Sequence, residues 1–315
     1  MLQKKPLISI VVPVFNEQES ISETTRRLLL LCKSLEDKVD TELIFVDDGS
    51  SDDSLAILKD LAVSWGGAIK LIALSRNFGH QIAITAGIDK ANGDYVAVID
   101  ADLQDPPELI GEMFQLAQKG YDVVYGKRKS RAGESWFKKV TASAFYRVLS
   151  YMCEIEIPLD TGDFRLMSRR AVDAFKLLRE KNRFVRGMVP WLGFKSVPFE
   201  YHREERYAGK TKYPLRKMLA FAVNAILSFS KKPLTLAVRL GFMTVLLGII
   251  LGVYVLYLKL FTSIPVPGVT VIILSIVIFG GAQIFLIGVV GEYIARIFEE
   301  VKRRPLYLVA ETVNF

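Results

Sequence analysis

Two aspartates separated by a single residue, Asp100 and Asp102, follow a short apolar run and form the pair best suited to chemistry in this sequence. In an extended chain alternate side chains point the same way, so both carboxylates can face one ligand. Carboxylate oxygens suit hard divalent cations, and such a cation can join the protein to a diphosphate. The pair, with Gln104 close behind, predicts a Mg²⁺ or Mn²⁺ site; helix capping or a surface turn is the alternative.

Other polar side chains stand where further apolar runs end. They are Asn16 and Glu17 after the first run, Asp47 and Asp48 after the second, and Arg76 and Asn77 after the third. In sheets of parallel strands, ligands bind beyond the carboxyl ends of the strands. We therefore expect these side chains to converge with the aspartate pair in one crevice, although each alone could be a turn former or a solvated charge.

The elements that must position these residues are read from hydrophobic periodicity. Continuous apolar runs, typical of strands buried on both faces, lie at residues 8–15, 43–46, 70–74, 95–99 and 123–125. Helical patterns lie between them, at about 19–35, 53–62, 81–91 and 107–118. This alternation predicts βαβ units and an α/β domain built on a mostly parallel sheet.

Five motifs, in this order and spacing, resemble the GT-A glycosyltransferases of family 2. They are VPVFNE at 12–17, VDDGS at 46–50, RNFG at 76–79, DADLQDPP at 100–107 and GKR at 126–128. Within the family the chain is similar to the polyprenyl-phosphate glycosyltransferases, a subgroup that includes dolichyl-phosphate mannose synthases and bactoprenol glucosyltransferases. The segment RYAGKTKY at 206–213 resembles the acceptor loop of this subgroup. The resemblance implies a Rossmann-like nucleotide-sugar domain of the GT-A type.

The resemblance also implies roles for individual residues. The nucleotide-sugar would be bound by Pro13, Asn16, Glu17, Asp47, Asp48, Arg76, Asp100 and Gln104, and the metal by Asp100, Asp102 and Gln104. The acceptor phosphate would be bound by Arg128, Arg131 and Ser135, with Arg206, Lys210 and Lys212 as second candidates. Asp102, Arg128 and Asp163 are the implied catalytic residues.

The role of Asp163 has two interpretations. Its place in Thr161-Gly162-Asp163 resembles the position of a catalytic base in the family. However, a phosphate whose second pKa is near ~6 is already a nucleophile at neutral pH, so no base is required. Asp163 could instead orient Arg128 or Arg131, or position the hydroxyls of the sugar.

The implied reaction is the inverting transfer of a hexose, with glucose from UDP-glucose as first choice, to undecaprenyl phosphate or another polyprenyl phosphate. Mannose and amino-arabinose donors stay open. A processive polysaccharide synthase would carry a Gln-x-x-Arg-Trp motif, and Trp65, Trp136 and Trp191 lack it. A non-catalytic nucleotide-binding membrane module would be expected to lose its metal carboxylates first.

Charge and cysteine content narrow the class of partner. The chain has 41 Lys and Arg against 34 Asp and Glu, a net charge of +7 that favours anionic partners such as phosphates and acidic lipid headgroups. We expect no nucleic-acid partner. Two cysteines in 315 residues provide neither a disulfide framework nor metal-ligand spacing.

Two long uncharged stretches, at residues 240–258 and 260–291, predict transmembrane helices at about 236–259 and 268–291. Basic residues flank the outer ends of this hairpin, so we expect both termini in the cytoplasm and the chain in the inner membrane. The small residues of the spans suggest a homo-oligomer.

The expected organisation has four parts: a cytoplasmic domain at 1–213, a juxtamembrane amphipathic helix at 214–232, the two spans within 233–298 and a cytoplasmic tail at 299–315. Residues 135–152 form a second amphipathic pattern, which suits either the membrane interface or packing on the sheet. No signal peptide is apparent at the N-terminus.

Overall fold

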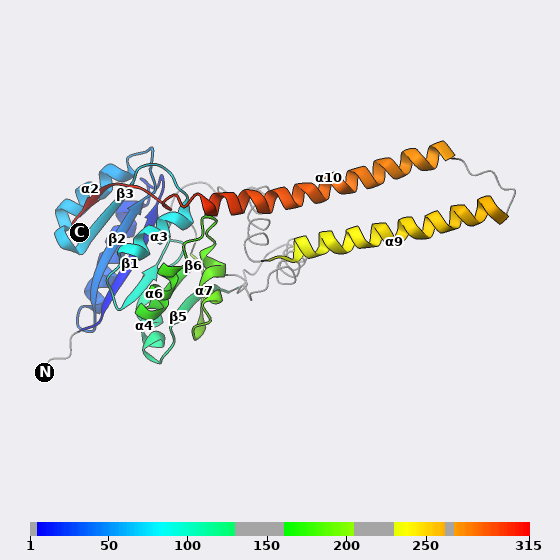
Figure 1. The fold of residues 1–315 in the computed structure, drawn as a ribbon. Helices are drawn as coiled ribbons and strands as arrows, with labels where there is room; N and C mark the ends of the chain where they lie inside the picture. Colours follow the sequence, from blue (N-terminus) through cyan, green and yellow to red (C-terminus); the bar gives the residue numbers. More distant parts are fainter. Residues whose placement is uncertain (1–4, 130–160, 205–229, 262–267) are drawn as a thin grey trace.

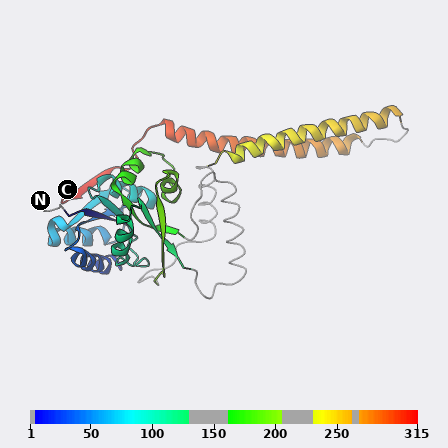
Figure 2. The same ribbon diagram turned by 90° about the horizontal axis from the view of Figure 1, so that it is seen from below.

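The structure is a computed structural model, and it describes residues 5–129, 161–204, 230–261 and 268–315. An α/β domain carries two long helices that project from it side by side (Figure 1). The second view shows the same separation between the domain and the helical pair (Figure 2). Of the expected parts, residues 135–152 and most of 214–232 lie outside the described ranges.

In the described residues, the α/β domain is built on one sheet of eight strands. The strands are β1 (Leu7–Val14), β2 (Asp40–Asp47), β3 (Ile69–Leu74), β4 (Tyr95–Val98), β5 (Val123–Arg128), β6 (Thr161–Ser168), β7 (Ser196–Tyr201) and β8 (Val309–Val313). Their order across the sheet is β7-β5-β6-β4-β1-β2-β3-β8. The strands from β4 to β3 run parallel, and β6 and β8 run antiparallel to their neighbours. The predicted α/β class and mostly parallel sheet are confirmed.

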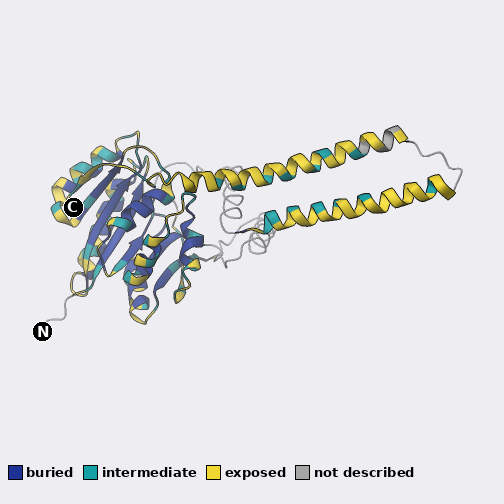
Figure 3. Ribbon diagram, in the orientation of Figure 1, coloured by how far each residue is buried: buried dark blue, intermediate teal, exposed yellow. Residues whose placement is uncertain are grey.

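Helices cover both faces of the sheet. They are α1 (Ile21–Leu35), α2 (Ser54–Trp65), α3 (His80–Lys90), α4 (Leu109–Gln118), α6 (Arg169–Leu177) and α7 (Val185–Trp191), with a 3₁₀ turn at Gly66–Ala68. Alternate residues of β1 point to opposite sides: Val12 packs with α1 and α4, whereas Val11 packs with α3. This arrangement explains the continuous apolar runs, and Figure 3 shows the sheet buried between its helices.

Strand β6 brings a distant part of the chain to the carboxyl ends of the parallel strands. It lies between β4 and β5 and pairs antiparallel with β4, with Arg165 opposite Val98. Continuing this register beyond the end of β4 sets Asp163 opposite Asp100. Because β6 runs in the opposite direction, its amino end reaches the same edge of the sheet at which β4 ends.

Two long helices, α9 (Lys232–Phe261) and α10 (Gly268–Val301), contain the predicted spans. Both are long and apolar enough to cross a membrane, and no residue of their most apolar windows is buried in the protein. A core helix of a soluble domain would be buried, so these two helices indicate membrane anchoring. α10 continues about ten residues beyond the predicted end of its span.

The C-terminal residues return to the α/β domain. Strand β8 pairs antiparallel with β3, with Thr312 opposite Ile72, and forms one edge of the sheet. The segment 299–315, expected to be a cytoplasmic tail, thus contains a strand of the sheet. Its single short strand gave no periodic signal, because its side chains are mostly exposed.

Candidate active site

Asp163 is the centre of the candidate site and is only 1% exposed. Arg186 of α7 donates two hydrogen bonds to its carboxylate, from Nε to Oδ1 at 3.1 Å and from an Nη to Oδ2 at 2.9 Å. Gln81 Nε2 donates to Oδ2 at 3.1 Å, and His80 Nε2 lies 3.2 Å from the same oxygen. Three side chains from two helices therefore converge on one buried carboxylate.

These neighbours determine the protonation state of Asp163. Burial alone would raise the pKa of its carboxyl group, but the guanidinium of Arg186 and the imidazole of His80 outweigh burial and hold that pKa well below its usual range. Asp163 is therefore an anion at neutral pH. A group with so low a pKa accepts protons poorly, which argues against the role of general base.

Arg165 connects Asp163 to α7 from inside the domain. Its buried guanidinium donates to the backbone carbonyl groups of Gly162, Asp163 and Val185 at 3.1, 3.1 and 3.2 Å. Gln81 Oε1 accepts from the backbone N–H of Val185 at 2.9 Å. The first turn of α7 is thus attached to β6 and α3, and these contacts orient Arg186.

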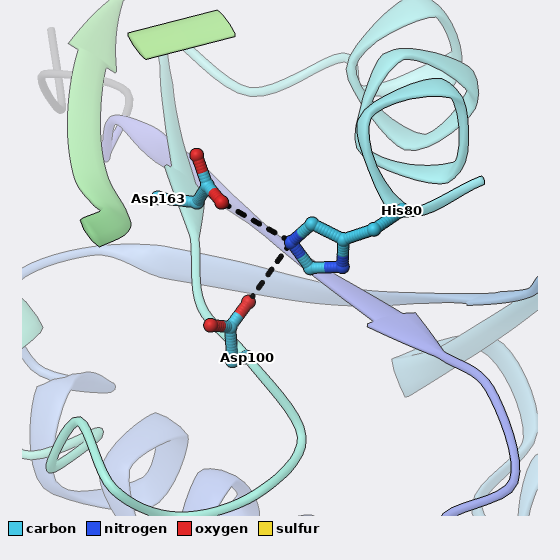
Figure 4. Close-up of side chains that lie close together, drawn as sticks. All are labelled: His80, Asp100 and Asp163. Carbon is cyan, nitrogen blue, oxygen red and sulfur yellow. Dashed lines mark hydrogen bonds and ion pairs between the residues drawn. The ribbon is translucent and has the colours of Figure 1, made fainter. Parts of the chain in front are cut away.

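His80 lies between Asp163 and Asp100, as Figure 4 shows. It is the first residue of α3, and its Nε2 lies 3.4 Å from Asp100 Oδ1 and 3.2 Å from Asp163 Oδ2. Desolvation by the surrounding protein would lower the pKa of the imidazole, but the charges of Asp100 and Asp163 outweigh it and raise that pKa to about 9. His80 therefore links the two carboxylates as a cation.

Asp100 has the chemistry of a metal ligand. Among the described residues its Oδ1 is buried without a hydrogen bond. Burial, together with the nearby Asp163, Asp105 and Asp102, raises the pKa of Asp100 to about 6 despite the opposing charge of His80. A carboxylate oxygen with no hydrogen bond, surrounded by further carboxylates, fits a divalent cation.

The ligand-type atoms of His80, Asp100 and Asp163 all lie within 4.8 Å of one another. Asp102, by contrast, is buried and accepts a hydrogen bond from the backbone N–H of Gln104 at 3.1 Å, which closes a turn. The structure thus brings Asp100 together with two residues that the motif did not include. Metal binding by Asp102 and Gln104 stays a prediction.

The residues predicted to bind the nucleotide lie in loops at the ends of β1 and β2. Asp47 is fully buried, and its Oδ2 accepts from the backbone N–H groups of Gly49 and Ser50, both at 3.2 Å. Asn16 Oδ1 accepts from the backbone N–H of Ser51 at 2.8 Å. Asp47 Oδ1 is buried without a hydrogen bond in the described part of the chain. These contacts join the two loops into one surface.

Asp48 supports the neighbouring loop at the end of β3. Its two carboxylate oxygens accept from the backbone N–H groups of Phe78 and Gly79, at 2.8 and 2.9 Å. The guanidinium of Arg76 lies over the ring of Phe78, 4.0 Å from its centroid. Asp48 is therefore occupied in holding the RNFG loop, and nucleotide binding by Asp48 and Arg76 stays a prediction.

The remaining predicted nucleotide residues are close by in the chain. Pro13 is buried within β1, and Glu17 donates its backbone N–H to Ser54 Oγ at 2.8 Å while its own carboxylate accepts from Ser20 Oγ at 3.0 Å. Glu17 thereby connects the end of β1 to the start of α2. Both residues lie at the same edge of the sheet as Asp47.

Arg128, predicted to contact the acceptor, lies beside Asp105 and Gly162. Its Nη is 3.9 Å from Asp105 Oδ2. Asp105 is fully buried and also accepts from Tyr201 Oη at 2.5 Å. A Cβ on Gly162 would lie 2.6 Å from the same guanidinium, so glycine is what allows Arg128 to lie against this backbone. The other predicted acceptor residues, Arg131, Ser135, Arg206, Lys210 and Lys212, lie outside the described residues.

Four residues at the site escaped the sequence analysis: His80, Gln81, Arg165 and Arg186. His80 and Gln81 directly follow the RNFG motif, so the end of β3 was a usable signal for both. Arg186 carries no such signal, because it lies on a short helix far along the chain from every predicted strand end.

Comparison with known proteins gives a consistent result. The profile of "Glycosyl transferase family 2" matches residues 9–175. The uncharacterised glycosyltransferase YkcC of Bacillus subtilis (strain 168) is 52% identical over 304 residues, which cover 96% of this chain and 93% of that protein. The bactoprenol glucosyl transferase of Shigella phage SfII is 39% identical over 308 residues, covering 97% and 98%.

A solved structure shares the fold. The mannosyltransferase PcManGT of Pyrobaculum calidifontis, in complex with GDP-Man and Mn²⁺, superposes with a TM-score of 0.50 at 16% identity, over 72% of this chain and 64% of that one. The similarity confirms the expected GT-A type of α/β domain.

Proposed function

This chain belongs to glycosyltransferase family 2, and from that membership we propose that it transfers a hexose from a nucleotide-sugar to a membrane-embedded polyprenyl phosphate. UDP-glucose and undecaprenyl phosphate are the first candidates for donor and acceptor. The name of the SfII relative supports both choices, and the two apolar helices support an acceptor that stays in the bilayer. Mannosyl and amino-arabinosyl donors are the alternatives.

The donor would bind along the carboxyl ends of β1, β2 and β4. Asp47 and the loop that it holds, with Pro13, Asn16 and Glu17, would receive the nucleoside. Asp100, with Asp102 and Gln104 close behind in the chain, would hold Mg²⁺ or Mn²⁺. When bound there, the ion supplies positive charge that neutralises the departing nucleoside diphosphate. The Mn²⁺ in PcManGT favours such a site, and so does the buried Asp100 Oδ1, which accepts no hydrogen bond from the described residues.

In the proposed reaction an oxygen of the lipid phosphate attacks the anomeric carbon. The new bond forms as the bond from that carbon to the diphosphate breaks, on the opposite face of the sugar, so the configuration inverts. The electron pair leaves with the nucleoside diphosphate. Because the attacking phosphate is already ionised, no proton needs to be removed from it.

Asp163 is then a positioning residue. Its ion pair holds the guanidinium of Arg186 at a fixed place, and its contact with His80 holds the imidazole beside Asp100. Cations oriented in advance stabilise anionic groups without reorganising during the reaction. Arg128, held against Gly162 and Asp105, would meet the acceptor phosphate, together with the predicted Arg131, Ser135, Arg206 and Lys210.

The active domain and the C-terminus would both lie on the cytoplasmic face of the inner membrane. The pairing of β8 with β3 supports a common side for domain and C-terminus, and the basic residues that flank the hairpin support the cytoplasm. Self-association through the small residues of the spans stays a prediction.

One observation carries the proposal: Asp100 and Asp163 meet at the carboxyl end of the sheet in a chain whose whole length matches a bactoprenol glucosyl transferase. The test is transfer of label from radiolabelled UDP-glucose to undecaprenyl phosphate by the full-length protein in liposomes with Mn²⁺. GDP-mannose and a UDP-amino-arabinose donor would be assayed in parallel.

We expect labelled glycolipid from the native protein and none above background from the Asp100→Asn, Asp102→Asn double variant. Asp60→Asn, on the exposed surface of α2, is the matched control and should keep the native rate. Undiminished synthesis by the double variant would refute the proposed metal site. Binding of UDP without transfer from any donor would instead favour a non-catalytic module.

A further inference from the structure

The cytoplasmic end of α10 is a continuous helical projection. Its uninterrupted uncharged run ends at Gly291, and the helix continues from Glu292 to Val301, which adds about 15 Å at 1.5 Å per residue. At the base of this projection Tyr293 Oη donates to the backbone carbonyl of Ser230, just before α9, at 2.7 Å. The projection therefore begins attached to the start of the other span.

The last turn of the projection contacts the loop that precedes α7. Glu300 Oε1 accepts from the backbone N–H of Lys181 at 2.6 Å, and Glu299 Oε2 accepts from Asn182 Nδ2 at 3.3 Å. The same loop leads directly to Val185 and Arg186, whose contacts with Gln81 and Asp163 belong to the candidate site. The end of a membrane helix and the active site thus share one short loop.

A second set of contacts follows where the chain leaves α10. Tyr307 Oη donates to Asp89 Oδ2 of α3 at 2.9 Å, and Arg179 pairs with the same carboxylate at 2.8 Å. The backbone carbonyl of Leu308 accepts from the N–H of Ser75 at 2.9 Å. The connection between α10 and β8 is therefore bonded to the domain and does not cross open solvent as a free linker.

The third set of contacts holds β8 and the final residues. Glu311 pairs with Lys59 of α2 at 2.5 Å. Asn314, at a φ of +64°, places Nδ2 2.8 Å from the backbone carbonyl oxygens of Ala62, Gly66 and Ile69, which share its two N–H groups. These few side-chain contacts would not order the C-terminal residues on their own. Together with the β3–β8 ladder they hold this segment along its whole length.

We propose that residues 292–315 form a rigid strut that fixes the height and orientation of the active site above the bilayer, and so aligns the site with acceptors embedded in the membrane. The strut is attached to the domain at three separate places, and one attachment reaches Arg186 through a single loop. A displacement of about 1 Å at a reacting centre can cost a large factor in rate. The active site must therefore be held at a fixed height, because the lipid phosphate cannot leave the headgroup plane.

The inference rests on the proposed function, and its test compares two acceptors. Undecaprenyl phosphate in liposomes requires the correct height, whereas a short, water-soluble prenyl phosphate in detergent does not. Inserting Ala-Glu-Ala-Lys between Ile297 and Phe298 lengthens the projection by about 6 Å while turning it by only about 40°. We expect this variant to lose about tenfold or more of its rate on the long acceptor and to stay within about twofold on the short one.

A second variant, Glu299→Ala with Glu300→Ala, removes one of the three attachments without lengthening the strut and should show a smaller selective loss on the long acceptor. Two controls accompany them: the same four residues added after Phe315, and Glu292→Gln, which alters an ion pair within α10. Neither control should change the ratio of the two rates. The strut would be refuted if the insertion left the long-acceptor rate unchanged, or if both rates fell together.

A distance measurement tests the strut independently of activity. If the protein transferred no sugar to either acceptor, that result would refute only the proposed function. A donor dye at Lys119→Cys, in a Cys32→Ala, Cys153→Ser background, would report energy transfer to labelled headgroups in liposomes. The strut predicts one narrow distance, increased by about 6 Å in the insertion variant. A broad distance distribution, or one unaffected by the insertion, would contradict it.

Discussion

At the scale of single residues, the candidate site is organised around a carboxylate that is fixed before any substrate arrives. Asp163 is buried, and each of its oxygens accepts a hydrogen bond from Arg186. A planar guanidinium that binds a carboxylate through two parallel N–H groups has a fixed orientation. The ammonium group of lysine carries the same charge but cannot make this two-point contact. The turnover rate should therefore depend on the orientation of the Arg186 guanidinium and not only on its positive charge.

Replacing Arg186 by lysine tests this dependence. The charge is kept but the two-point contact with Asp163 is lost, so we expect kcat to fall by about tenfold to a hundredfold, with a smaller change in the KM for the donor. Steady-state rates with UDP-glucose and undecaprenyl phosphate provide the measurement.

Arg170 supplies a matched control for this variant. It also meets a carboxylate, that of Asp122, through two nitrogens, but on the surface away from the site. Arg170→Lys should leave kcat unchanged. A normal kcat in Arg186→Lys would show that charge alone is sufficient at this position.

At the scale of elements, the donor surface depends on two loops that approach very closely. Gly49, after β2, has a φ of +68°, and a Cβ there would lie 2.5 Å from the backbone carbon of Arg76, after β3. The obstructing atoms belong to the backbone and cannot rotate away. Glycine at this position is thus required by both backbone conformation and space.

We predict that Gly49→Ala forces the loops after β2 and β3 apart. Strain of this kind costs about 1–3 kcal/mol, and UDP affinity should fall at least about tenfold, measured by calorimetry with Mn²⁺. Gly66→Ala separates the two causes, because Gly66 also has a positive φ but a Cβ there meets nothing within 4 Å. It should lower stability alone, and an equal loss of UDP affinity in Gly66→Ala would contradict the explanation by contact.

The opposite end of the sheet is stabilised by a buried carboxylate, Glu42 of β2. It accepts from Ser9 Oγ at 2.5 Å and from the backbone N–H of Asn92 at 3.0 Å, and pairs with Lys70 at 2.6 Å. Burial would raise the pKa of Glu42, but Lys70 and Ser9 outweigh it and lower that pKa below its usual value of 4.5. A carboxyl group whose pKa is lower in the folded state stabilises the fold when it is ionised.

The stability from Glu42 should therefore be fully present above about pH 4.5 and should be lost as the pH falls through the lowered pKa. We expect Glu42→Gln to lower the free energy of unfolding at pH 7 by about 1–3 kcal/mol, and to flatten its decline below pH 4.5. Thermal unfolding in detergent across this pH range provides the measurement. Glu36→Gln, on the surface, is the control; an acid decline as steep in Glu42→Gln as in the native protein would refute the role of this carboxylate.

At the scale of the whole molecule, the chain leaves the α/β domain, runs through two apolar helices and returns to the edge of the same sheet. The pairing of β8 with β3 is possible only if the C-terminus and the domain share one side of the membrane. The chain runs out along α9 and back along α10 (Figure 1), so two membrane crossings by these helices would meet this requirement.

Cysteine labelling of oriented vesicles tests this topology. In a background without native cysteines, single cysteines at Lys119 and at a residue added after Phe315 should react with a membrane-impermeant maleimide in inside-out vesicles only. A cysteine at Ser263, between the two spans, should react in right-side-out vesicles only. Labelling of the first two positions from opposite sides would exclude both the topology and the β3–β8 pairing within one chain.

The sequence by itself determined the α/β class, the strands from β1 to β5, the helices between them and the two apolar helices. Each of these follows from local physical signals: hydrophobic period, turn residues and uninterrupted apolar length. It also placed Asp47 and Asp100 at the ends of parallel strands, which must meet at one edge of the sheet. Asp163 followed only from the resemblance to the family.

Only the tertiary structure decided which side chains surround those carboxylates. His80 and Arg186 reach Asp163 because the antiparallel β6 inserts beside β4 and because Arg165 attaches α7 to it, and neither event leaves a periodic trace in the chain. The pairing of β8 with β3 also leaves no local pattern in the sequence. The strand is exposed and only five residues long, and its position depends on backbone pairing with a strand more than two hundred residues away. Contacts between distant segments depend on the packing of the whole fold, and no local pattern encodes them.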